Sequence, residues 1–195
     1  MRERFNRTKE SIDYAAYTPG VWVLRAADLI FLNRTCYNGL FRVNSRGHFN
    51  VPSGRYRHPC IVSRVNLCAA SQLLARAEVR QGDFTACEPF VDEKTFVYID
   101  PPYRPLTRTA KFTSYARSSF GDDDQIRLAA FCRRLDGIGA YFMLSNSDPR
   151  NADPDDGFFD DLYDGFSIER VPARRAINRD GNGRGCLAEI LVMNY

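Results

Sequence analysis

The sequence predicts an α/β sheet domain over residues 66–195, preceded by a smaller region of helices and a β-hairpin over residues 1–65. In the second region, short apolar runs typical of strands alternate with helical segments, which is the pattern of a sheet covered by helices. In the first region, helical periodicity gives way to short segments between turn residues such as Asn38-Gly39. The length of 195 residues suits one domain, or one domain with a small insert.

Local signals place each element in order. The first region is expected to form helices over 3–16 and 21–32, then two hairpin segments, 40–44 and 48–52, around the turn Ser45-Arg46-Gly47. The second region is expected to form helices over 66–77, 122–135 and 158–163, and strands over 78–80, 95–99, 140–144, 166–171 and 187–193. Three aspartates open the helix at 122, where they suit its positive N-terminus. The runs 95–99 and 140–144 are apolar throughout, so we expect both strands to be buried.

Composition narrows the functional classes. No apolar run approaches the roughly 20 residues of a membrane helix, and the charged N-terminus lacks the apolar core of a signal peptide. A soluble, cytoplasmic protein is therefore expected. The six cysteines form no Cys-x-x-Cys pair that could bind zinc together with the two histidines. We therefore expect free thiols and no metal.

Charge is distributed unevenly along the chain, although the net charge is only +3. From Leu29 to Ala77 there are 49 residues without an acid, and the same stretch holds seven arginines. A solvated surface usually mixes both signs, whereas a long stretch of one sign is typical of a surface that binds phosphates. A high arginine content alone is the simpler explanation that remains open.

The sequence Asp100-Pro101-Pro102-Tyr103 directly follows the predicted strand 95–99. Aspartate and proline also favour turns, but ligands in open α/β sheets bind at the carboxyl ends of strands. This set suits an amine on a nucleic-acid base, whose lone pair is delocalised into the ring. The Asp100 carboxylate and the Pro101 carbonyl can accept from its two N–H groups, and Tyr103 can stack on the base. Such a base must first leave the helix, at a cost of a few kcal/mol.

The chain resembles the Dam-type (D12 class) DNA N6-adenine methyltransferases. Asp100-Pro101-Pro102-Tyr103 resembles their catalytic motif, and residues 33–44 with 47–56 resemble their target-recognition hairpin. Further resemblances lie at Gly82-Asp83-Phe84, at 112–115, at 145–148 and at 189–195. The resemblance implies a partial class I methyltransferase sheet, Rossmann-like, that transfers a methyl group from S-adenosylmethionine to adenine N6 in double-stranded DNA. Among DNA sequences, the resemblance favours GATC as the methylated site. It further implies a monomer and leaves open a cognate restriction endonuclease in a restriction-modification system.

The resemblance also implies residue roles. Asp100, Pro101, Pro102 and Tyr103 would form the catalytic loop, and Asp83, Phe84 and Asp100 would contact the methyl donor. The tyrosine of Tyr-Asn-Gly-Leu would fill the gap left by the flipped adenine, and the later arginine would read a guanine, as arginine does in the major groove. Leu40 also fits a core position, and Arg55 also fits a plain phosphate contact. The residues expected at DNA are Arg34, Tyr37, Asn38, Gly39, Leu40, Arg42, Asn50 and Arg55.

One departure from the family pattern concerns the donor. The family carries a Phe-x-Gly-x-Gly loop upstream of the recognition region, and no such motif occurs here; Gly137-Ile138-Gly139 and residues 181–185 fit flexible turns better. We therefore expect the 195 residues alone to bind S-adenosylmethionine weakly and to show no methylation. A catalytically silent DNA-binding remnant is the alternative. Methyltransferases that act on protein glutamine typically have Asn in place of Asp100, and those that act on cytosine N4 typically have Ser. Asp100 and the recognition hairpin therefore argue against both of these classes.

Overall fold

The computed structural model describes residues 1–10, 17–105, 120–174 and 186–195. Internal contacts divide the chain into two units, Met1–Arg80 and Gln81–Tyr195, which are described separately. Helix α3 belongs to the first unit by these contacts, whereas the boundary predicted from the sequence lies between residues 65 and 66. No described helix has the length and apolar character needed to cross a membrane.

The first unit is built on two helices, α1 (Arg2–Glu10) and α2 (Pro19–Thr35), followed by the short 3-10 turn η2 (Tyr37–Gly39) and α3 (Arg64–Leu74). The described residues 2–10 confirm the first predicted helix in part, and residues 11–16 lie outside the described part. The buried core of this unit consists of Phe5, Leu32, Cys36, Phe49 and Val51. Helices α1 and α2 are joined by a bidentate ion pair of Arg4 with the buried carboxylate of Asp28, at 2.6 and 2.8 Å.

The predicted hairpin forms in outline but not as two regular strands. Asn44 donates to the carbonyl of His48 (2.9 Å) and Asn50 to that of Arg42 (3.1 Å), so the two segments run antiparallel. However, only one β-bridge, Val43 with Phe49, falls between them. The Asn44 side chain accepts from the backbone N–H groups of Arg46 and His48, both at 3.0 Å. The Asn44 side chain therefore helps to close the turn, as is common for asparagine, and the predicted hairpin is confirmed in part, as an antiparallel pair of segments with one bridge.

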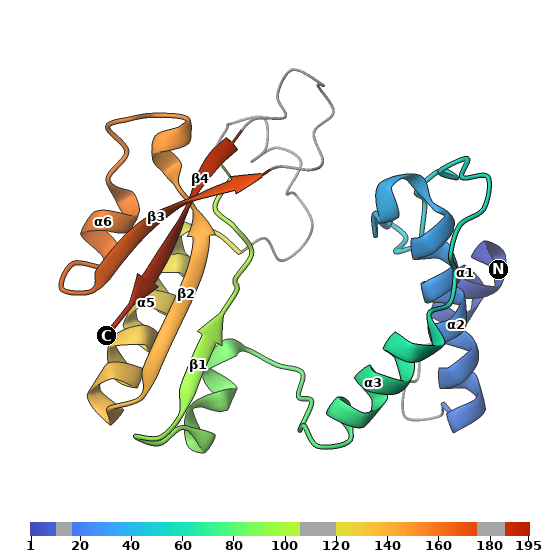
Figure 1. The fold of residues 1–195 in the computed structure, drawn as a ribbon, viewed down its shortest axis with the longest axis horizontal. Coiled ribbons are helices and arrows are strands. Elements are labelled where there is room, and N and C mark those ends of the chain that lie inside the picture. Colours follow the sequence, from blue (N-terminus) through green and yellow to red (C-terminus); the bar gives the residue numbers. More distant parts are fainter. Residues whose placement is uncertain (11–16, 106–119, 175–185) are drawn as a thin grey trace. The chain divides into compact units, whose positions relative to one another are not determined.

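The second unit is an α/β domain with one mixed sheet of four strands (Figure 1). The spatial order is β1-β2-β4-β3, in which β1 and β2 are parallel and the other neighbours antiparallel. This confirms the predicted fold class. In chain order the elements are η3 (Phe84–Phe90), β1 (Phe96–Ile99), α5 (Asp122–Ile138), β2 (Tyr141–Ser147), η4 (Pro149–Asn151), α6 (Phe158–Leu162), β3 (Ser167–Arg174) and β4 (Cys186–Met193).

The core of the second unit lies between the sheet and helices α5 and α6. It includes Leu128 and Phe131 of α5, Phe142 of β2, Phe159 of α6 and Ile190 of β4. Helix α5 ends because Gly139 adopts φ 87°, which glycine tolerates and which caps the helix. The prediction of a turn at Gly137-Ile138-Gly139 holds only for Gly139, because Gly137 and Ile138 are the last residues of α5. Residues 112–115 and 181–185 lie outside the described part.

Two strand predictions need correction. Strand β1 forms as expected, but it is not buried on both faces: Val97 and Ile99 pack on the core, whereas Phe96 and Tyr98 are 55% and 60% exposed. The apolar run hides this alternation because both exposed residues are aromatic. No strand forms at residues 78–80, where Val79 is 76% exposed and a strand would lack a sheet to pair with.

Candidate active site

The loop Asp100–Tyr103 lies at the carboxyl end of β1, next to the carboxyl end of β2. The hydroxyl of Ser145, on β2, donates a hydrogen bond of 3.1 Å to Oδ1 of Asp100. The same hydroxyl lies 3.3 Å from that of Tyr98, which can therefore act as the donor. Ser145 is buried, while Asp100 is exposed. One carboxylate oxygen is thus held from the sheet, and the residue faces solvent.

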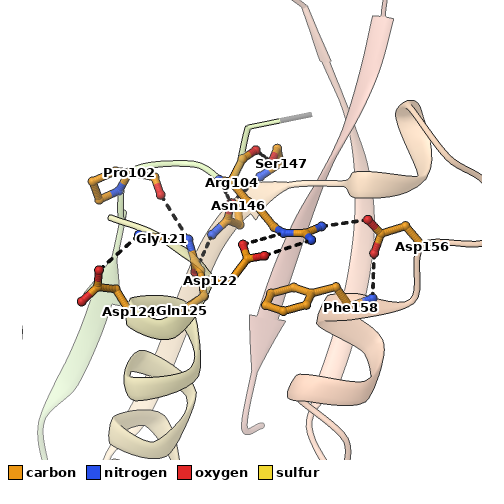
Figure 2. Close-up of polar contacts among 10 residues, drawn as sticks. All are labelled: Pro102, Arg104, Gly121, Asp122, Asp124, Gln125, Asn146, Ser147, Asp156 and Phe158. Atoms are coloured by element: carbon orange, nitrogen blue, oxygen red, sulfur yellow. Dashed lines mark hydrogen bonds and ion pairs between the residues drawn. The ribbon is translucent and has the colours of Figure 1, made fainter. Parts of the chain in front are cut away.

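A second set of contacts holds the other end of the loop (Figure 2). Nε2 of Gln125, on α5, donates to the carbonyl of Pro102 at 3.2 Å. The backbone N–H of Arg104 donates to Oδ1 of Asn146 at 3.1 Å, and the hydroxyl of Ser147 donates to the carbonyl of Arg104 at 2.8 Å. Asn146 and Ser147 are the last two residues of β2. The parallel neighbour strand therefore holds the backbone that follows the loop Asp100–Tyr103.

The side chain of Arg104 adds an ionic connection. Its guanidinium pairs with Asp122 at 3.0 Å and with Asp156 at 2.8 Å, and lies 4.2 Å from the ring centre of Phe158. Figure 2 shows it between the first turn of α5 and the segment before α6. The guanidinium satisfies acids from two different elements, so it ties the loop to both.

Tyr103 lies on the same loop, and its hydroxyl donates to Oε2 of Glu189 at 3.3 Å. Burial, with the nearby carboxylates of Glu189 and Asp100, raises the pKa of Tyr103 above its ordinary value. The phenol is therefore neutral near pH 7. Tyr103 as a whole is 37% exposed, so part of the residue remains accessible.

Asp83 and Phe84, predicted to contact the donor, lie where η3 begins. Asp83 accepts from the backbone N–H and the hydroxyl of Thr85 (3.1 and 2.7 Å) and pairs with Arg127 (3.0 Å). The bonds from Thr85, followed by the Arg127 side chain, lower the pKa of Asp83 to about 2. Phe84 packs 5.5 Å from the ring of Phe131. Both residues thus have structural partners, and their contact with a donor stays a prediction.

The residues predicted to contact DNA belong to the first unit. Tyr37, Asn38 and Gly39 form η2, in which Asn38 and Gly39 have φ of 53° and 62°. Glycine adopts such a conformation freely, and asparagine more readily than most residues. Tyr37 and Leu40 are 54% and 39% exposed, so Leu40 is not a core residue.

The predicted DNA-contacting arginines are exposed. Nε of Arg42 donates to the side chain of Asn50 at 2.8 Å, which orients the guanidinium across the turn. Arg34 lies in the last turn of α2, and Arg55 has φ of 54°. A guanidinium held by one neighbour keeps further N–H groups for an acceptor. The contact of these residues with DNA stays a prediction.

A family model described as D12 class N6 adenine-specific DNA methyltransferase matches residues 1–177. The chain belongs to this family. It is 49% identical over 196 residues to a type II methyltransferase of Methanocaldococcus jannaschii, which covers 100% of this chain and 63% of that relative. It is 39% identical over 175 residues to a type II methyltransferase of Lactococcus lactis (89% of this chain, 59% of the relative). It is 32% identical over 199 residues to a DNA adenine methylase of Escherichia coli (99% and 63%). This D12-class chain spans about three fifths of the length of these relatives.

Three residues that contact the loop Asp100–Tyr103 were not predicted individually: Gln125, Ser145 and Glu189. Asn146, which bonds to the next residue, Arg104, was not predicted individually either. The segment Ser145-Asn146-Ser147-Asp148 gave a usable signal, because it is polar and follows a buried strand. The carboxyl ends of neighbouring parallel strands meet at the same edge of a sheet, so these residues are expected to lie close to Asp100. Gln125 carried no comparable signal. Among the described residues, no group of three His, Cys, Asp or Glu side chains is placed to hold a metal ion.

Proposed function

We propose that this chain carries the catalytic loop and the DNA-recognition residues of an enzyme that methylates adenine N6 in double-stranded DNA, with S-adenosylmethionine as the methyl donor. The observation that carries this proposal is the Asp100 carboxylate, held through Oδ1 by Ser145 at the end of β1 and followed by two prolines and Tyr103. An acceptor in this position suits the exocyclic amine of a base. Membership of the D12 class supports the same chemistry.

The proposed mechanism uses these groups in order. The amine of a flipped adenine donates one N–H to Asp100 and the other to the carbonyl of Pro101, while Tyr103 stacks on the ring. These acceptors favour positive charge on nitrogen as its lone pair forms a bond to the methyl carbon. When bound, S-adenosylmethionine would supply the methyl group and would keep the electron pair of the broken carbon–sulfur bond on sulfur; the amine, held by Asp100 and Pro101, would then release one proton to water. Holding the amine in line with the methyl group supplies much of the rate.

For DNA recognition we propose GATC as the site and the first unit as the reader, with Arg42 on a guanine and Tyr37 in the space left by the flipped base. The support is the exposure of Tyr37 and the orientation of Arg42 by Asn50. Arginine can bond O6 and N7 of guanine together. Arg34 and Arg55 are proposed as backbone contacts, which position a protein without reading sequence.

For the donor we propose contacts from Asp83 and Phe84. A carboxylate whose pKa is lowered to about 2 stays ionised at neutral pH and can accept from hydroxyl groups. Calorimetric titration of the full-length protein with S-adenosylmethionine would show weaker binding in Asp83→Ala than in the parent.

The site proposal is tested by methyl transfer in the full-length protein. A labelled methyl group on S-adenosylmethionine is offered to duplexes that differ only in one GATC, and incorporation is counted. We expect label in the GATC duplex and little in a duplex where the site is scrambled. Equal incorporation into both would exclude GATC as the site. A lack of label in either duplex would contradict the proposed activity.

A further inference from the structure

Gln125 is a fully buried polar side chain within the apolar face of α5. Its relative exposure is 0%, and the neighbouring positions on that face, Leu128 and Ala129, belong to the core. A buried amide without partners is costly, so such groups are normally hydrogen-bonded. Both ends of the Gln125 amide are bonded: Nε2 donates to the carbonyl of Pro102 and Oε1 accepts from Nδ2 of Asn146, each at 3.2 Å.

Asn146 continues this set of bonds and fixes its direction. It is also 0% exposed, and its Oδ1 accepts from the N–H of Arg104 (3.1 Å) and from its neighbour Ser147 (2.9 Å). Because Oδ1 is occupied by two donors, Nδ2 must be the group that faces Gln125. Two amides therefore connect Pro102 to Arg104 through the interior, as Figure 2 shows.

The catalytic loop needs such support because of its composition. Pro101 and Pro102 have no backbone N–H, so neither can be held as a hydrogen-bond donor. Their carbonyls are the polar backbone groups that remain for attachment. Between the carbonyls of Pro101 and Pro102 only φ and ψ of Pro102 can turn, and the ring fixes φ. Fixing the Pro102 carbonyl therefore limits the orientation of the peptide that carries the Pro101 carbonyl.

We propose that Gln125, supported by Asn146, is a positioning residue for methyl transfer: it holds the Pro102 carbonyl so that the Pro101 carbonyl and Asp100 meet the amine together. This inference rests on the proposed function. An apolar side chain at this position would leave Nδ2 of the buried Asn146 without its partner, at a cost in stability. The rate of methyl transfer is therefore the measurement that separates positioning from stability. Gln125 touches the loop and not the reacting atoms, so its effect is on rate through geometry.

The test compares Gln125→Met with Asn194→Met in the full-length protein. Asn194 is a matched control, because its amide also links backbone groups of this sheet: it accepts from Phe142 and donates to the carbonyl of Ala140, both at 2.9 Å. These bonds lie at the other end of β2, away from the loop. Two quantities are measured in each protein: the single-turnover rate of methyl transfer to a GATC duplex, and hydrogen exchange at the Arg104 amide.

In Gln125→Met we expect the rate to fall by about 10- to 100-fold with the Kd for DNA unchanged, since small misplacements of reacting groups have effects of this order. Exchange at the Arg104 amide should quicken, because its acceptor Asn146 loses its own support. Asn194→Met should leave the rate and this exchange unchanged. A parent-like rate in Gln125→Met would overturn the proposal whatever the exchange at Arg104, as would parent-like exchange there or equal losses in both variants.

The exchange arm also works in the parent protein. There the Arg104 amide should exchange far more slowly than an unprotected amide, and unprotected exchange would overturn the inference even if Gln125→Met did not fold. Failure of the proposed function has a different signature: the parent would transfer no methyl group, while protection at Arg104 and its loss in Gln125→Met would remain.

Discussion

Replacing Arg104 with methionine should destabilise the protein by about 2 kcal/mol. Methionine keeps the apolar stem and the backbone bonds to Asn146 and Ser147 and removes the guanidinium. The Arg104 side chain is 15% exposed, and its partners Asp122 and Asp156 are 41% and 27% exposed. These ion pairs are therefore neither fully buried nor fully at the surface. Exposed pairs contribute roughly 0.2–1 kcal/mol each and breaking a buried pair costs about 3–5 kcal/mol. The contact with Phe158 at 4.2 Å adds about 0.5–1 kcal/mol.

Arg134→Met is the matched control. Arg134 pairs with one acid, Glu88 at 3.1 Å, whereas Arg104 pairs with two; its guanidinium also lies 5.4 Å from the ring centre of Phe131, and its side chain is 45% exposed. Water solvates this guanidinium in the folded state, so we expect a loss below about 1 kcal/mol. Urea unfolding of both variants, followed by circular dichroism, gives the two free energies of unfolding. Equal losses, or a stabilised Arg104→Met, would refute the argument that partial burial decides the difference.

Three further predictions concern the proposed chemistry, the recognition of DNA and pH. Asp100→Ala should abolish methylation in the full-length protein while DNA binding survives; normal turnover would remove Asp100 from the mechanism. Arg42→Ala should relax specificity at one guanine by roughly 1–3 kcal/mol, measured by competition between duplexes, with Arg46→Ala as a hairpin control; uniform weakening over all sequences would make Arg42 a backbone contact. The pKa of Asp83 is lowered from 3.8 to about 2, so its stabilisation is present above pH 3.8 and is lost as the pH falls toward 2. Melting curves should therefore show the difference between the parent and Asp83→Asn shrinking through that window, and a constant difference would contradict the assignment.

The strands, the helices of the second unit and the place of the Asp100 loop after β1 were predictable because each depends on a local signal. The run before Asp100 had to be a strand, and the aspartates at 122–124 had to open a helix. The exposure of Phe96 and Tyr98 was not predictable, because an aromatic residue fits a covered or an open face equally well. The role of the Asn44 side chain in the turn was not predictable either. Its Oδ1, in place of a backbone carbonyl, accepts from the N–H groups of Arg46 and His48.

The residues that hold the loop Asp100–Tyr103 were harder to predict than the loop itself. Asp100 is marked by its position after a strand, whereas Gln125 acts on Pro102 across 23 positions in the sequence. Such a contact follows from the packing of α5 on the sheet, which periodicity predicts only as an apolar face. Ser145 was easier to predict than Gln125 and harder than Asp100. Its segment ends β2, which is parallel to β1, so both strands end at the same edge of the sheet.

The most direct test of the central claim identifies the modified atom. The full-length protein is incubated with S-adenosylmethionine and a duplex that contains one GATC, and the DNA is then digested to nucleosides for mass spectrometry. We predict N6-methyl-deoxyadenosine as the methylated nucleoside. Methylation of cytosine, or the absence of any methylated nucleoside, would contradict the claim that the Asp100 loop accepts the adenine amine.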